Sequence, residues 1–439
     1  MPSLSRRLAR EVRALTPGDL TDVLIDKVKI GLLDMLSCAF EARELPWGRQ
    51  AIQMAARSQG SASIIGTGMQ SSTGDAAFAN ATLGHGLVRE DMHTGAISHL
   101  GVVIYPALLA CAQRVPVHGE RFILGAVCGY EIGASIGRAL VDRDFARLHR
   151  PTGTTGPIGG AVAAGILLGL NEDALCSAIG LAANTAGGLN EWAYAGGDDM
   201  FFHPGFAARS AVTAVELAEL GAVAAESALD GQAGLFACAG RAARLSEVTP
   251  FRNGDWEILS VYYKPAPACN YAQTACQAAL SIGVPAREIE TVAVKASAAA
   301  VSYPGCDFKG PFKRILQAKM SIQYCVAATL FHGAIAEENY RRLDDPEIAR
   351  LVAAMTLEVS DDFTAAYPGR QGAEVSVRLR NGETRTIRMD DVAPATPDEI
   401  RRRFRVAAGA RAAEIEAFVD SLERKRDAGA LGKLLEKDY

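Results

Sequence analysis

The chain has 439 residues, of which 49% are hydrophobic and 22% charged, and its formal net charge is −5. These values are typical of a soluble globular protein that is large enough for two domains. The acidic balance and the dispersed basic residues argue against a nucleic-acid surface, so we expect no nucleic-acid partner.

The nine cysteines form no CxxC pair and lie mostly within apolar helical runs. This usage is typical of free thiols in a reducing compartment. The N-terminal segment is amphipathic and lacks the apolar centre of a signal peptide, and the longest strongly apolar run, residues 161–170, is too short to cross a bilayer. We therefore expect a cytoplasmic protein with no membrane partner.

Helical periodicity dominates the chain from Leu4 to about Ile282, with one short β-like piece at residues 61–67. Many of these segments are rich in Ala and Gly, which lets helix axes approach closely. The sequence therefore predicts a large helical domain. Its expected helices after the N-terminal one span residues 20–42, 50–58, 75–87, 101–114, 120–141, 157–168, 172–189 and 205–220.

The pattern changes near Ile289, where alternating residues predict strands. Asn381-Gly382 is a strong hairpin signal between two of them. From Pro397 the chain reads as helix again. We therefore predict a mainly α fold, in which a helical domain (1–265 plus 397–439) carries an inserted α/β lid domain (266–396) with hinges near 264–270 and 393–397. The expected lid elements are strands at 291–300, 357–360, 373–379 and 384–389, and helices at 270–282, 317–332 and 346–355.

One polar loop, within residues 80–106, contains three of the seven histidines. It lies between two predicted buried helices, where a site can be rigid and still reach solvent. A solvated turn is the simpler interpretation, but three histidines mixed with carboxylates favour a site. Metal binding ranks second: His-x5-His with Asp91 offers ligands for zinc or iron, but no HExxH motif or Cys/His pairing supports it. The titratable residues are His85, Arg89, Glu90, Asp91, His93 and His99.

Three later segments also carry polar or reactive residues. The Gly/Thr-rich run 150–160 leads into a predicted helix and could present backbone N–H groups to an anion, with His149 and Arg150 favouring a carboxylate. Prolines stiffen the segment 264–269 and would aim Lys264 reproducibly. Tyr324 lies in a predicted buried helix, where core packing is its commoner role.

Taken together and in order, these segments resemble the MmgE/PrpD family of 2-methylcitrate dehydratases, cis-aconitate decarboxylases and iminodisuccinate epimerases. The resemblance covers nearly the whole chain. The matching segments are Asn80 to Pro106, the Thr-Gly run 150–170, KPAPAC at 264–269, AKMSIQY at 318–324 and PDEIRRRF at 397–404.

The resemblance implies a homodimer with a lid domain, an active site between the domains, and cofactor-independent proton chemistry on di- and tricarboxylates. By position, His99, Lys264 and Tyr324 match family active-site residues, and Asp91 matches an acidic position. The chain departs from the family pattern at five positions. The residue here and the family's residue are, in order, Val88 for Asp, Met92 for Thr, Arg150 for His, Met200 for Lys and Gln273 for His.

We therefore expect a lyase that dehydrates a hydroxy di- or tricarboxylate such as 2-methylcitrate, without cofactor or metal. An epimerase, a decarboxylase and a non-catalytic binding protein remain alternatives. The reaction needs a base, cationic donors for the developing enediolate, and an acid for the leaving hydroxyl. His99 or His93 has the right chemistry for the base, Lys264 and Arg150 for carboxylate binding, and Tyr324 for the acid. The expected catalytic residues are His99, His93, Asp91, Lys264 and Tyr324, and the expected substrate-binding residues are Arg89, Arg150, Thr152, His203 and Gln273.

Overall fold

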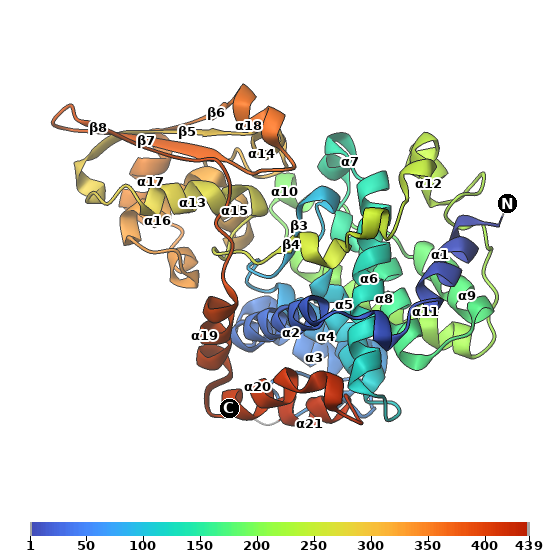
Figure 1. Cartoon of the computed structure of the whole chain (residues 1–439). Coiled ribbons are helices and arrows are strands. Elements are labelled where there is room, and N and C mark those ends of the chain that lie inside the picture. The colour runs from blue at the N-terminus through green and yellow to red at the C-terminus, as the bar shows by residue number, and fades with distance from the viewer. Residues whose placement is uncertain (1, 437–439) are drawn as a thin grey trace.

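The structure is a computed structural model that describes residues 2–436. It is mainly α-helical, with a large helical part and a small α/β unit at the upper left of the view (Figure 1), as the sequence predicted. The large part is not purely helical, because two short strand pairs join its loops. These pairs are β1 (Ala62–Ser63) with β2 (Gln70–Ser71), and β3 (Met92–His93) with β4 (Val261–Tyr262).

Several helices of the large part begin at side-chain caps. Thr21, Ser72 and Asn171 each accept a hydrogen bond from a backbone N–H in the first turn of the following helix. The helices are α1 (Leu4–Arg13), α2 (Asp22–Ala42), α3 (Pro46–Ala55), α4 (Thr73–His85), α5 (Gly101–Ala112), α6 (Gly119–Leu140), α7 (Arg143–Leu148), α8 (Pro151–Leu168), α9 (Glu172–Ala183), α10 (Trp192–Ala195), α11 (His203–Glu219) and α12 (Leu235–Cys238).

Helices α6 and α8 pack closely at the centre of this part because glycines face each other. A Cβ on Gly129 would lie 2.8 Å from the carbonyl oxygen of Gly159, and one on Gly159 would lie 2.9 Å from the carbonyl oxygen of Gly129. Real Cβ atoms do not approach that closely without a shift of the neighbour. The prediction that small residues bring helix axes together is therefore confirmed.

Helix α8 begins earlier than its composition suggested. The sequence predicted a helix from Pro157, whereas the Gly/Thr run before it is already helical from Pro151. Arg150 precedes the helix in an extended conformation, and a proline at the first helical position needs no N–H partner. The Thr155 hydroxyl donates to the Pro151 carbonyl at 3.1 Å, so this polar side chain is satisfied inside the buried helix.

The α/β unit is a four-stranded sheet with helices on one face (Figure 1). The strand order is β6-β5-β7-β8; β5 and β6 are parallel and the other pairs antiparallel. Asn381-Gly382 joins β7 to β8 as predicted, with Gly382 at a φ of 89°. The strands are β5 (Ile289–Ala296), β6 (Met355–Val359), β7 (Ala373–Leu379) and β8 (Thr384–Met389), and the helices are α13 (Gln273–Leu280), α14 (Ala298–Ser302), α15 (Ile315–Met320), α16 (Ile322–His332), α17 (Pro346–Ala353) and α18 (Asp361–Ala366).

The helix predicted over residues 317–332 is two helices, α15 and α16, separated at Ser321. The Ser321 hydroxyl accepts from the Tyr324 N–H at 3.0 Å, which caps α16, and donates to the Phe308 carbonyl at 2.6 Å. A serine with two such partners favours a cap over a helix interior, which explains the break.

The C-terminal helices return to the large helical part, where α19 lies beside α2 (Figure 1). The two chain segments that join the α/β unit to the rest lie side by side, because the Ala395 N–H donates to the Tyr263 carbonyl at 2.9 Å. Arg403 of α19 donates to the carbonyls of Lys264 and Pro265. The domain division and a lid motion about the two segments both stay predictions. The helices are α19 (Pro397–Ala408), α20 (Ala412–Asp420) and α21 (Ala430–Leu435).

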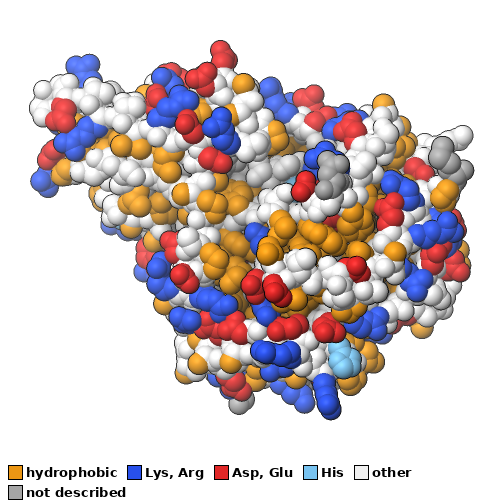
Figure 2. Space-filling view, in the orientation of Figure 1, with side chains coloured by type: hydrophobic (Ala, Val, Ile, Leu, Met, Phe, Trp, Pro, Cys, Tyr) orange, Lys and Arg blue, Asp and Glu red, His pale blue; other side chains and the backbone are white. Residues whose placement is uncertain are grey.

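On the face shown in Figure 2, basic and acidic side chains are intermingled, and hydrophobic side chains gather between the α/β unit and the helical part. All nine cysteines are free, and Cys238 alone is exposed. Within residues 2–436 no helix combines the length and the apolar character that a membrane crossing requires.

Candidate active site

A small pocket of about 10 Å³ lies where the large helical part meets the α/β unit. Both parts and the segment that connects them contribute to its wall. The helical part provides Val88, Met92, Ile97, His99, Arg150 and Met200. The connecting segment and the α/β unit provide Cys269, Asn270, Tyr271, Tyr303 and Met320.

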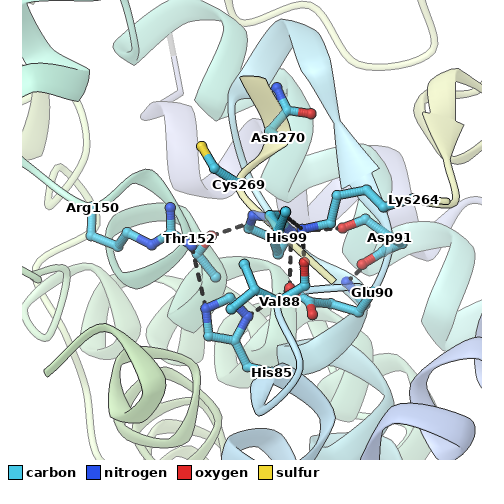
Figure 3. Close-up of polar contacts among 12 residues, drawn as sticks. His85, Val88, Glu90, Asp91, His99, Arg150, Thr152, Lys264, Cys269 and Asn270 are labelled. Atoms are coloured by element: carbon cyan, nitrogen blue, oxygen red, sulfur yellow. Dashed lines mark hydrogen bonds and ion pairs between the residues drawn. The ribbon is translucent and has the colours of Figure 1, made fainter. Parts of the chain in front are cut away.

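His99 is held in one orientation and one tautomer. Its Nδ1 lies 2.8 Å from the Asp91 carbonyl oxygen and 3.1 Å from Glu90 Oε1 (Figure 3). Both oxygens are acceptors, so Nδ1 carries the proton and Nε2 keeps its lone pair. The Thr152 hydroxyl accepts from the His99 backbone N–H at 3.0 Å, which fixes the main chain as well. Nε2 has no hydrogen-bond partner in the described part of the chain.

His99 is neutral at ordinary pH. Its side chain is 3% exposed, and burial lowers the pKa of His99 well below 6.5; the nearby Lys264 ammonium lowers it further, and Glu90 opposes the shift. A neutral imidazole with a free Nε2 in a pocket wall can accept a proton from a bound molecule.

Glu90 joins two histidines at the base of the pocket. Its Oε1 lies 2.6 Å from His85 Nδ1 as well as close to His99. Burial alone would raise the pKa of Glu90, but His85, Lys264 and His99 hold it below its usual value, so the group is a carboxylate. Its negative charge would stabilise an imidazolium at His99 after proton uptake.

Arg150 and Lys264 bring positive charge to this cluster without a carboxylate of their own. Arg150 Nη1 lies 3.3 Å from the Tyr303 hydroxyl and Nη2 lies 3.4 Å from His85 Nε2, while its buried Nε has no partner. Lys264 is fully buried and donates to the Val88 carbonyl at 2.5 Å; burial lowers the pKa of Lys264, and the nearby Glu90 opposes the shift. In contrast, Arg89 and Lys319 form salt bridges with Glu41 and Glu337. An unpaired buried guanidinium is suited to bind an anion.

Two β-branched residues of the pocket wall have left-handed backbone conformations. Val88 has a φ of 57° and Ile97 a φ of 49°. Such conformations cost about 1–3 kcal/mol each and persist only where the surroundings impose them. At Val88 the Lys264 ammonium holds the carbonyl, and at Leu87 the Lys319 ammonium does so at 2.9 Å. The strained loop therefore presents its side chains to the pocket in a fixed arrangement.

Asp91 and His93 are directed away from the pocket. Asp91 Oδ2 accepts from the Tyr130 hydroxyl at 2.5 Å and from the Gly101 N–H, and burial raises the pKa of Asp91 to about 6. His93 Nδ1 accepts from the Ala96 N–H, and its Nε2 lies 2.9 Å from Glu257. Asp91 thus positions α5 and His99, and both nitrogens of His93 are engaged elsewhere.

The expected substrate-binding residues separate into two groups. Arg150, Thr152 and His203 lie around the cluster; burial and the neighbouring Arg150 lower the pKa of His203 to about 3, so it is neutral. Arg89 points to Glu41 and Ser37 of α2 instead. The Gln273 side chain bonds to backbone groups of the 266–269 turn, which makes it a support for the Lys264 segment.

Tyr324 is not brought to the cluster. Its hydroxyl donates to the carbonyls of Asn339 and Arg342 within the α/β unit, and its ring packs against Phe312 and Tyr340. The tyrosine that reaches the pocket from the α/β unit is Tyr303.

The sequence reasoning left four supporting residues out of the site: His85, Glu90, Tyr303 and Lys319. Two of them, His85 and Glu90, were visible in the histidine-rich loop, and their density of charge was the available signal. Lys319 lies in the matching segment 318–324, which was the available signal for it, whereas Tyr303 carried none because its role depends on tertiary contacts. Within residues 2–436, no three His, Cys, Asp or Glu side chains are grouped as metal ligands would be, and the metal-free reaction stays a prediction.

The fold and the site define a two-part protein with a buried His-Glu pair and an unpaired arginine at the junction of its parts. Residues 6–247 match the MmgE/PrpD N-terminal domain and residues 266–424 match the MmgE/PrpD C-terminal domain. The chain belongs to the MmgE/PrpD family.

Curated relatives cover nearly the whole chain. A cis-aconitate decarboxylase-like protein of Aspergillus oryzae is 28% identical over 99% of this chain and 97% of its own length. Cis-aconitate decarboxylases of Aspergillus terreus and Homo sapiens are 26% and 25% identical, over 96% and 93% of this chain and 93% and 88% of their own lengths. The chain is therefore similar to cis-aconitate decarboxylases over nearly its whole length.

Proposed function

We propose that this protein is a lyase that removes a proton beside a substrate carboxylate and expels a hydroxyl group from the next carbon, without a cofactor. The single observation that carries the proposal is the neutral His99, with Nδ1 held by Asp91 and Glu90 and Nε2 free beside the unpaired Arg150. A base and a carboxylate anchor are thus adjacent, as α-proton abstraction requires.

The reaction would be an elimination of water from the substrate. Arg150 binds the carboxylate, and His99 Nε2 takes the α-proton. Arg150 and the positive field of Lys264 stabilise the developing enediolate, and Glu90 stabilises the imidazolium through Nδ1–H. Tyr303 gives its proton to the departing hydroxyl, which leaves as water; burial raises the pKa of Tyr303, so the phenol is protonated beforehand. Proton return from His99 to Tyr303 restores both groups.

Dehydration of a hydroxy di- or tricarboxylate such as 2-methylcitrate belongs to this reaction class. Decarboxylation is the second candidate, because the relatives are named for it. It would need a protonated group to donate to carbon, whereas His99 is neutral in this site. Elimination is therefore our first proposal and decarboxylation the second.

The proposal is tested by exchange in deuterated water. Short 3-hydroxycarboxylates incubated with the protein should take up deuterium at C2 and form the corresponding alkenoates, followed by NMR. A binding protein without catalysis would raise its melting temperature with these ligands and leave C2 unlabelled. Loss of carbon dioxide from an added alkenoate dicarboxylate, without C2 exchange of the hydroxy acids, would favour the decarboxylase over the dehydratase.

The neutral state of His99 gives a pH prediction. A histidine with the ordinary pKa of 6.5 is half protonated at that pH, whereas His99, with its pKa well below 6.5, should stay unprotonated. NMR titration of the histidine Cε1 signals, with His99→Gln used to assign the resonance, should show no change at His99 as the pH falls from 8 to 6. A midpoint at or above 6.5 would contradict the proposed state of the base.

A further inference from the structure

Five of the residues that line the candidate site have wholly apolar or thioether side chains. These residues are Val88, Met92, Ile97, Met200 and Met320. Ile97 is partly buried and the other four are buried. His99 and Arg150 carry the polar chemistry, and Asn270 is engaged by Gln371 and by the Tyr262 hydroxyl. A ligand bound here therefore meets charge at Arg150 and hydrocarbon or thioether where it contacts Val88, Ile97 and the methionines.

The charges around the pocket balance at most one further negative charge. Arg150 is a cation without a salt bridge. Burial lowers the pKa of Lys264, whereas Glu90, the carboxylate beside it, opposes the shift. Burial lowers the pKa values of His85, His99 and His203, so these three are neutral. At most two positive charges therefore face one negative charge, which leaves room for no more than one substrate carboxylate.

Other cations near the pocket are either paired, as Arg89 and Lys319 are with Glu41 and Glu337, or lie outside its wall. Arg143 and Arg147 border a neighbouring hollow, and Ile97, Tyr271 and Tyr303 line both that hollow and the pocket. The two arginines are exposed to solvent on α7. A second carboxylate inside the pocket would thus lie against Val88 and the methionines with no cation of its own.

We infer that the substrate has one carboxylate, bound by Arg150, and an apolar remainder that packs against Val88, Met92, Met200 and Met320. The inference rests on the proposed function and narrows its substrate from di- and tricarboxylates to hydroxy monocarboxylates. It assigns the three methionines and Val88 as specificity-determining residues. Flexible thioethers adapt to an alkyl chain, whereas an unpaired buried carboxylate pays a large desolvation cost.

A matched pair of ligands tests this preference. 3-Hydroxypentanoate and 3-hydroxyglutarate have the same five-carbon chain and differ in a terminal methyl against a second carboxylate. Calorimetry with the full-length protein should show 3-hydroxypentanoate binding at least about tenfold more tightly, because the second carboxylate would be buried without a partner. Deuterium uptake at C2 is measured for both in the same preparation.

A cation placed in the pocket wall should change which of the two ligands binds more tightly. Met200→Lys should shift the ratio of the two dissociation constants toward 3-hydroxyglutarate by at least about tenfold, since the new ammonium can pair with the second carboxylate. Met200→Leu keeps an apolar side chain of similar volume and should keep the original order. If circular dichroism shows that Met200→Lys does not fold, Met320→Lys replaces it in the test. This variant adds the positive charge from the α/β unit instead of the helical part.

The outcomes separate the inference from the proposed function. Equal or tighter binding of 3-hydroxyglutarate by the unaltered protein, or binding of neither ligand, overturns the inference. Turnover of 3-hydroxyglutarate in that case would leave the proposed lyase intact. Tighter binding of 3-hydroxypentanoate without deuterium uptake at C2 of either ligand would support the inferred ligand class. It would overturn the proposal that the protein is a lyase.

Discussion

His99→Gln should lower kcat about 100- to 10,000-fold, the usual contribution of a positioned general base. Glutamine is close to histidine in size, and its amide can donate to the Asp91 carbonyl that now accepts from His99 Nδ1 at 2.8 Å. The fold should therefore survive while the proton acceptor is lost. Turnover and C2 deuterium uptake, measured together with the melting temperature, check the expectation.

The same substitution at His93 separates the two candidate bases. His93 lies in the same loop, but its Nε2 is engaged by Glu257 and its Nδ1 by the Ala96 N–H. We expect His93→Gln to lower the melting temperature and to change kcat far less than His99→Gln. Full activity in a folded His99→Gln protein, or a larger loss of kcat at His93, would remove His99 as the base.

Arg150→Gln should reduce kcat/KM roughly 30- to 4,000-fold, equivalent to about 2–5 kcal/mol for the loss of one partner of a buried charge pair. The guanidinium has no carboxylate partner in the described chain, so its charge is available to a ligand. The defect should appear in KM and in kcat, because the same carboxylate carries the developing charge. Steady-state kinetics with 3-hydroxypentanoate provide the measurement.

Arg89→Gln is the matched control for this change. Arg89 is also buried, but its guanidinium is paired with Glu41 and bonded to Ser37. Its loss should cost stability and leave KM nearly unchanged. An unaltered KM in Arg150→Gln would show that the carboxylate binds elsewhere, and a raised KM in Arg89→Gln would return Arg89 to the binding site.

Local sequence signals were sufficient for most of the fold. Periodicity indicated the long helices, the glycines of α6 and α8 indicated close packing, and Asn381-Gly382 indicated the β7-β8 hairpin. The errors occurred where a tertiary contact changes the local preference. Burial makes the Gly/Thr run of α8 helical, and the double hydrogen bonding of Ser321 divides one expected helix into two.

The site was predictable to the extent that its residues are neighbours in sequence. His99, Arg150, Thr152 and Lys264 were identified from two loops and one stiff segment, and the structure brings them together. Neighbouring residues in a loop point in different directions, which composition cannot resolve: Glu90 faces the cluster while Arg89 faces α2. The choice of Tyr303 over Tyr324 depends on how the α/β unit docks, which no single segment encodes.

The return of α19 to α2 has a consequence for synthesis of the chain. Residues of α2 leave the ribosome early, but the helix that lies beside them begins only at Pro397. At about 5–20 residues per second, the intervening chain takes on the order of tens of seconds to emerge. During that time the apolar flank of α2 that contacts Phe404 through Phe40 is uncovered. The nascent helical part therefore keeps an apolar surface exposed until the residues from Pro397 onward have been made.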